Sequence, residues 1–142
     1  MATEAKPFEF VAHTADVAVL IHGRNIPDLF RHAAAALYAL TTTGPDFAAV
    51  QCRTISIDSV DRDALLVDWL NELVYLLYVE HVGFSDFRFD ELADGHLTSR
   101  CCGECLVPGV HKLHLEVKAA THHMVHIVQR RGGYTARIVL DV

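Results

Sequence analysis

Apolar side chains recur every three or four residues in two stretches of this chain, and this spacing is typical of amphipathic helices. The first helix is predicted over residues 26–40. Asn25 is a favourable N-cap, Pro27 suits a first helical turn, and the Thr-Thr-Thr-Gly-Pro sequence at 41–45 ends the pattern.

The second stretch has a wider apolar stripe and predicts a longer helix. Asp61 or Asp63 is expected to cap it, and the helix is expected to run to about His81, with Gly83 ending it. We interpret its polar side as a solvated face, with a docking face as the alternative. This polar side consists of Asp68, Asn71, Glu72 and Tyr75.

Between and after these helices, apolar and polar residues alternate, which predicts strands. Asp94-Gly95 and Gly132-Gly133 are hairpin turn signals. The order strand, strand, helix, strand, helix and then five strands is not that of a parallel α/β fold. We therefore predict an α+β fold in which two helices pack on a largely antiparallel β-sheet. The predicted strands include residues 8–10, 17–21, 50–57, 111–119 and 134–140.

Residues 111–119 show the cleanest alternation and predict one strand with an apolar and a polar face. Lys112, Glu116 and Lys118 project from its polar face and are candidate functional residues. The alternative is an ordinary wet sheet face, and alternation alone does not separate the two interpretations.

Length and composition are those of one globular domain over residues 1–142, since 51% of the 142 residues are hydrophobic and 21% are charged. No apolar run is long enough to cross a membrane, and residues 1–7 lack the apolar core of a signal peptide, so we expect a cytoplasmic protein. The formal net charge of −6 argues against an autonomous nucleic-acid binder.

The four cysteines do not form a familiar motif. Cys102 and Cys105 form a C-x-x-C, but it follows a predicted strand instead of opening a helix, where the dipole would lower a thiol pKa. A structural zinc site usually needs a second cysteine pair, and only Cys52 lies outside the Cys101–Cys105 cluster. We interpret the cysteines as incidental thiols, with a redox motif and a zinc site as the alternatives.

Ten histidines are many for this length, but their spacing opposes zinc. His111 and His114 point to opposite faces of a strand, because they are three residues apart. His122 and His126 share a face of a strand but lie roughly 13 Å apart, at about 3.3 Å per residue. The sequence has no G-x-S-x-G, P-loop or G-x-G-x-x-G motif, and we assign no catalytic residue.

Four collinear segments resemble the archease family. The first two are residues 8–17, which contain Phe-Glu-Phe and His-Thr-Ala-Asp, and residues 65–73, Leu-Leu-Val-Asp-Trp-Leu-Asn-Glu-Leu. The third is residues 116–123, where family members commonly read E-V-K-A-x-T-Y-H, and the last is Leu-Asp-Val at 140–142. The chain departs from the family at the cysteine cluster and at His122, where tyrosine is common.

This resemblance implies a function and a site. Archeases are small α+β proteins that assist the GTP-dependent RNA-splicing ligase; they promote guanylylation of the ligase histidine and multiple turnover, and meet RNA only indirectly. The family's metal ligands fall on Asp16, Asp141 and an oxygen of Val142, and its important charged residues fall on Glu116 and, next, Lys112.

The carboxylates of Asp16 and Asp141 and an oxygen of Val142 form a negatively charged set of oxygen ligands, which favours hard cations. We therefore expect Ca²⁺ as the bound ion, with Mg²⁺ or Mn²⁺ as alternatives. The resemblance therefore predicts an accessory protein, not an enzyme. Two other functions stay open: a chaperone-like binding module whose metal is purely structural, and a stand-alone metallohydrolase using Asp16, Asp141 and nearby histidines.

Overall fold

The computed structural model of the protein describes residues 6–12 and 16–142. Two larger antiparallel sheets have the strand orders β1-β2-β9-β8 and β4-β6-β5, and β3 pairs with β7. The elements in chain order are β1 (Phe8–Ala12), β2 (Asp16–Gly23), α1 (Ile26–Thr41), β3 (Thr42–Thr43), β4 (Gln51–Asp58), α2 (Arg62–Tyr78), β5 (Val82–Leu92), β6 (His96–Cys105), β7 (Lys112–Leu113), β8 (Ala119–Arg130) and β9 (Gly133–Asp141).

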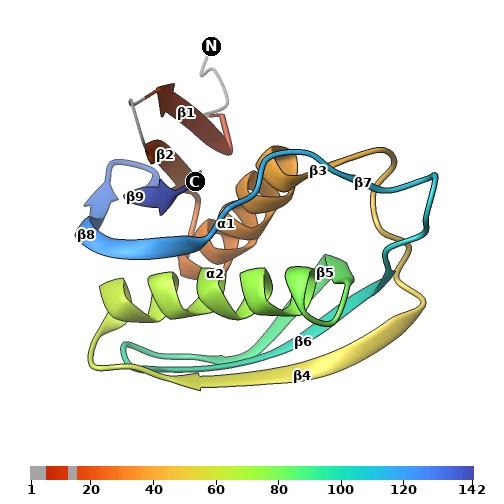
Figure 1. Cartoon of the computed structure of the whole chain (residues 1–142). Coiled ribbons are helices and arrows are strands. Elements are labelled where there is room, and N and C mark those ends of the chain that lie inside the picture. Colours follow the sequence, from red (N-terminus) through yellow and green to blue (C-terminus); the bar gives the residue numbers. More distant parts are fainter. Residues whose placement is uncertain (1–5, 13–15) are drawn as a thin grey trace, which may run out of the picture.

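Both helices contact both larger sheets (Figure 1). Helix α1 packs on β2 and β5, and α2 packs on β8, β4 and β5. The predicted α+β class is confirmed, but the expected single sheet is two separate ones. Strand β9 pairs between β2 and β8, whereas β6 pairs between β4 and β5. No helix in the described part of the chain is long and apolar enough to span a membrane.

The helix starts follow the sequence prediction closely. The side chain of Asn25 accepts a hydrogen bond from Asp28 N–H at 2.8 Å, and Asp61 caps α2 by accepting from Ala64 N–H at 2.8 Å. The predicted end of α2 is wrong, because the helix stops at Tyr78 and Gly83 lies inside β5. Positive φ at His81 turns the backbone, and buried Val82 then starts the strand.

Trp69 of α2 lies at the centre of the core. Its side chain is fully buried, its indole N–H donates to the carbonyl of Phe30 at 3.0 Å, and its ring packs edge-on against Phe87 and Phe89 of β5. An aromatic side chain of this size contributes a large apolar area, and the buried N–H needs a partner. Trp69 therefore joins α2, α1 and the second sheet.

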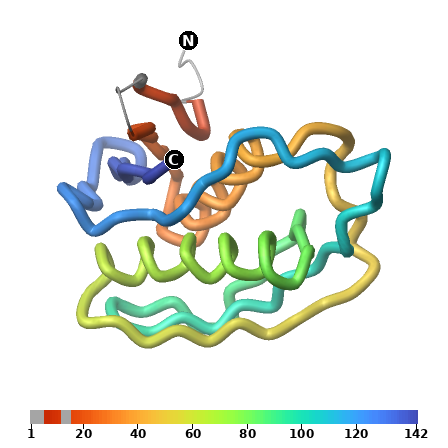
Figure 2. The backbone as a smooth tube through the Cα atoms, viewed as in Figure 1, coloured from red at the N-terminus to blue at the C-terminus, as the bar shows by residue number. Residues whose placement is uncertain are grey.

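The predicted strand over 111–119 is wrong for most of its length. Only Lys112 and Leu113 form a strand, and β8 begins at Ala119. The backbone between them finds other partners: His114 N–H donates to the carbonyl of Thr41 at 2.7 Å, at the end of α1. Figure 2 shows this segment as an extended trace that leads from β7 to β8. The alternating sequence gives an extended chain here, but no strand in the described part of the molecule pairs with residues 114–118.

Candidate functional site

Asp16 and Asp141 are directly opposite each other on adjacent strands of the first sheet. Asp16 is the first residue of β2, Asp141 is the last residue of β9, and the two are antiparallel register partners. Directly opposed residues in such a pair have Cβ atoms about 4.5–5.5 Å apart and point to the same face. Two like charges so placed repel each other, and a cation bound between them relieves that repulsion.

The end of β9 is held in place on its other side by β8. Asp141 is also the register partner of Ala119, and its carbonyl accepts a hydrogen bond from Lys118 N–H at 2.8 Å. The side chain of Val142 is partly buried against the core. The last residues are therefore ordered by pairing and packing, although chain ends commonly fray. His13 to Ala15 of the His-Thr-Ala-Asp motif lie outside the described residues.

The donor set at this position fits a hard cation. Carboxylate and carbonyl oxygens are the ligands of Ca²⁺, Mg²⁺ and Mn²⁺. Within residues 6–12 and 16–142, no group of three or more histidine, cysteine, aspartate or glutamate side chains is arranged to hold a metal. Asp16 and Asp141 make a pair, so an ion between them needs main-chain oxygens, water or a partner's groups to complete its shell.

Lys112, Glu116 and Lys118 are all exposed, but they do not share one strand face. Lys112 lies in β7 opposite Thr43, whereas Glu116 and Lys118 lie in the irregular segment between β7 and β8. Burial raises the pKa of the Tyr78 hydroxyl, the hydrogen bond from Val117 N–H opposes that rise, and the charge of Glu116 adds to it. Glu116 thus lies near the end of α2, and Lys112 belongs to β7.

Two histidines pair with carboxylates of α2. His122 Nε2 lies 3.7 Å from Asp68 Oδ1, and His126 Nδ1 lies 3.3 Å from Asp63 Oδ2. The regular-strand geometry used to place these histidines fails, because the β8–β9 register shifts between Thr121 and His126 and Met124 has φ of 56°. Each of these two imidazoles therefore lies beside a different carboxylate of α2. Sequence periodicity did not predict either pair.

His111 and His114, which the strand argument placed on opposite faces, differ in burial. His111 is buried, with its Nε2 3.3 Å from Glu104 and its ring against Phe47, whereas His114 is exposed. The strand argument that separated them does not apply, because only Lys112 and Leu113 between them are strand.

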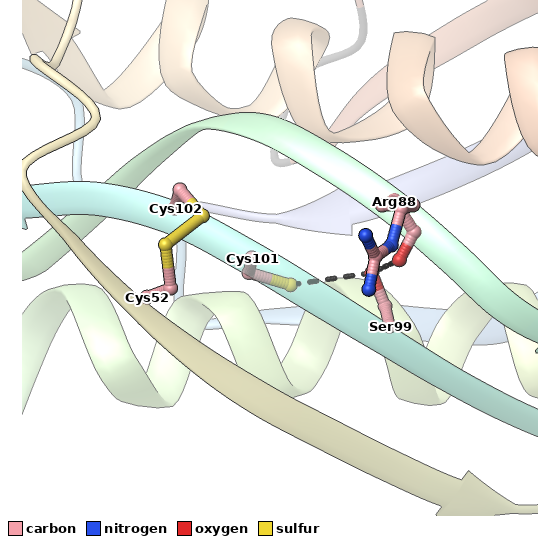
Figure 3. Close-up of a disulfide and its surroundings, with 5 residues drawn as sticks. All are labelled: Cys52, Arg88, Ser99, Cys101 and Cys102. Carbon is pink, nitrogen blue, oxygen red and sulfur yellow. Dashed lines mark hydrogen bonds between the residues drawn. A yellow bond between two sulfur atoms is a disulfide. The ribbon is translucent and has the colours of Figure 1, made fainter.

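Cys52 and Cys102 form a disulfide, so the interpretation of all four cysteines as incidental thiols is wrong. The two residues are register partners in β4 and β6, and Figure 3 shows the bond bridging these strands. Cys101 is buried and points the other way, with its Sγ 3.4 Å from Ser99 Oγ; burial raises its pKa to about 11. Cys105 is an exposed free thiol.

Fold and site together define a class of small α+β protein in which the two central strands of one sheet, β2 and β9, bring two aspartates into register. The archease protein family model matches residues 8–142, and the chain belongs to the archease family. It is 39% identical over 140 residues to an archease of Methanothermobacter thermautotrophicus, covering 96% of this chain and 99% of that protein. It is 30% identical to an archease of Methanosarcina mazei over the whole length of both.

Solved structures agree with this assignment. The solution structure of a Methanobacterium thermoautotrophicum protein superposes with a TM-score of 0.76 at 36% identity, covering 96% of this chain and 99% of that one. The crystal structure of a Thermotoga maritima archease, described as a "possible chaperone", has a TM-score of 0.63 at 17% identity over the full length of both chains. The second likeness concerns the fold alone.

Proposed function

We propose that this protein activates a GTP-dependent RNA-splicing ligase by promoting its guanylylation and multiple turnover. Membership of the archease family is the observation that carries the proposal. Asp16 and Asp141, with an oxygen of Val142, form its divalent-metal site, and Ca²⁺ is the first candidate ion. A bound ion supplies positive charge at this surface, and the ligase itself performs the phosphoryl chemistry.

The charges of the described surface support a protein partner over RNA. The chain carries a formal net charge of −6, and phosphate contacts require a basic face. Lys118 donates its backbone N–H to the carbonyl of Asp141, and exposed Glu116 lies two residues earlier, so carboxylates and an ammonium group occur close to the end of β9. Such mixed charge suits recognition of a protein near its nucleotide site.

Turnover of the ligase on RNA with a 3′-phosphate end, at saturating GTP, tests the proposal. We expect several products per ligase molecule when this protein is present and about one or fewer when it is absent. Equal turnover in the two reactions contradicts it. Incubation of this protein alone with RNA and nucleotide is the control for the metallohydrolase alternative, and we expect no product there.

The chaperone-like binding module that the sequence left open is the second candidate function. The Thermotoga relative is described as a "possible chaperone". A chaperone-like module that uses its metal only for structure would raise the yield of folded ligase without changing the turnover of ligase that is already folded. Adding this protein after the ligase has been purified and shown to be folded therefore separates the two functions.

Glu116 gives a prediction for the partner surface. Glu116→Ala should reduce ligase activation about tenfold, because truncating one charged contact at an interface typically costs about 1–2 kcal/mol. The melting temperature should stay within about 2 °C of the parent, since the side chain is exposed. Asp86→Ala, at an exposed position of β5 in the second sheet, is the matched control. A Glu116→Ala protein that melts far below the parent would show a structural role.

A further inference from the structure

Helix α2 holds residues 115–120 through two side chains. The Tyr78 hydroxyl donates to the carbonyl of Leu115 at 3.2 Å and accepts from Val117 N–H at 2.9 Å. The Asn71 amide donates to the carbonyl of Ala120 at 3.0 Å and accepts from the N–H of the same residue at 2.8 Å. Each side chain thus bonds one backbone donor and one acceptor, as a neighbouring strand would.

The hydrogen bonds of Tyr78 and Asn71, which we call the two anchors, lie on either side of the charged residues Glu116 and Lys118 in the chain. Glu116 lies between the two backbone groups that Tyr78 binds, and Lys118 lies between the Tyr78 and Asn71 anchors. Val117 is fully buried and Ala120 nearly so, while Glu116 and Lys118 are exposed. The anchored segment therefore turns apolar side chains inward and charged side chains outward without being part of a sheet until Ala119.

The anchored segment is also joined to the paired aspartates. Lys118 N–H donates to the carbonyl of Asp141, and Ala119 is the register partner of Asp141, which in turn faces Asp16. Seven positions separate Asn71 from Tyr78, so they lie two turns apart on one side of the helix. One side of α2 thus sets the position of Glu116 and Lys118 relative to the aspartates.

We propose that Asn71 and Tyr78 are positioning residues that hold residues 115–120 in one preformed conformation, so that Glu116 and Lys118 meet the partner protein together with the Asp16–Asp141 site. The role rests on the proposed function above. A segment without strand neighbours loses conformational entropy when it is ordered, and ordering it before binding removes that cost from the binding free energy. The polar side of α2 was interpreted as a solvated face, with a docking face as the alternative. Part of it has a third role, because Asn71 bonds the backbone of the protein's own chain at Ala120.

Amide hydrogen exchange measures the anchoring itself and does not depend on the ligase. Tyr78→Phe keeps the ring and removes both hydroxyl hydrogen bonds, so exchange at Val117 N–H should become at least about fivefold faster. Asn71→Ala should do the same at Ala120 N–H. Tyr75→Phe is the matched control, because Tyr75 lies on the same helix and is 51% exposed. Unchanged exchange at Val117 in Tyr78→Phe overturns the anchoring.

Ligase activation measures the positioning role. In Tyr78→Phe, the concentration that gives half-maximal activation should rise about five- to tenfold, the effect of one to two lost hydrogen bonds, while the maximal turnover is retained. Ile55→Val, a buried substitution in β4, supplies a variant with a similar loss of melting temperature and should leave the half-maximal concentration unchanged.

Two results overturn the role. One is an unchanged half-maximal concentration in Tyr78→Phe despite faster exchange at Val117, and the other is an equal shift in Ile55→Val. Failure of the parent protein to activate the ligase is a different result: it overturns the proposed function, and the exchange data then report anchoring alone.

Discussion

Replacing Asp16 or Asp141 by asparagine should weaken Ca²⁺ binding at least about 100-fold and remove most ligase activation. Each change keeps the shape of the side chain and removes one unit of charge. Two unit charges 4 Å apart interact by about 4 kcal/mol at an effective dielectric constant of 20, and the double charge of Ca²⁺ makes its attraction to a carboxylate larger. Desolvation reduces this energy, but the loss of Ca²⁺ affinity should still exceed about 100-fold. Isothermal titration calorimetry measures the affinity.

The same variants should be as stable as the parent without metal, or up to about 1 kcal/mol more stable, because like charges directly opposite in a sheet destabilise it. The parent should gain about 2.7 kcal/mol at a Ca²⁺ concentration 100 times its dissociation constant, and the variants should gain none. Asp46→Asn, at an exposed loop position, is the matched control. Unchanged Ca²⁺ affinity in both variants would place the metal elsewhere.

Reducing the Cys52–Cys102 disulfide should lower the free energy of unfolding by about 2–4 kcal/mol and the melting temperature by about 10 °C. The bond joins residues 50 positions apart, so it removes much of the loop-closure entropy of the unfolded chain. Thermal unfolding with and without a dithiol reductant measures the effect. Ligase activation should persist at low temperature, since the bond lies in the second sheet and the aspartates lie in the first.

Two variants make this measurement specific. A Cys52→Ser, Cys102→Ser double variant should melt at the temperature of the reduced parent and should not respond to reductant. Cys105→Ser removes an exposed free thiol and should behave as the parent in both conditions. A parent whose melting temperature is the same with and without reductant would show that the bond contributes no stability.

The disulfide also bears on where the protein works. Disulfides persist mainly in oxidising compartments, and those of cytosolic proteins are mostly transient or redox-sensing. The cytoplasmic location expected from the sequence remains a prediction, and thiol alkylation of the protein in its cell tests it together with the state of Cys52 and Cys102.

Local structure was predictable because its causes lie within a few residues. Asn25 and Asp61 cap their helices by bonding backbone groups three positions away, and the turn predicted at Asp94-Gly95 joins β5 to β6. The turn predicted at Gly132-Gly133 lies one residue earlier, at Arg131 and Gly132, because Gly133 is already the first residue of β9. Alternation also predicted strands at 50–57 and 134–140, where β4 and β9 lie. Family resemblance, and no local pattern, led to the expectation that Asp16 and Asp141 meet.

Contacts between segments distant in the sequence determined the positions of the paired aspartates, the disulfide and residues 111–119. The register of β2 with β9 sets Asp16 opposite Asp141, and the register of β4 with β6 sets Cys52 opposite Cys102. Residues 111–119 alternate as a strand does, yet the backbone around Leu115 bonds the end of α1 and Tyr78. A sequence pattern states which side chains prefer burial, whereas the partner of each backbone group depends on which distant segment the packed core brings beside it.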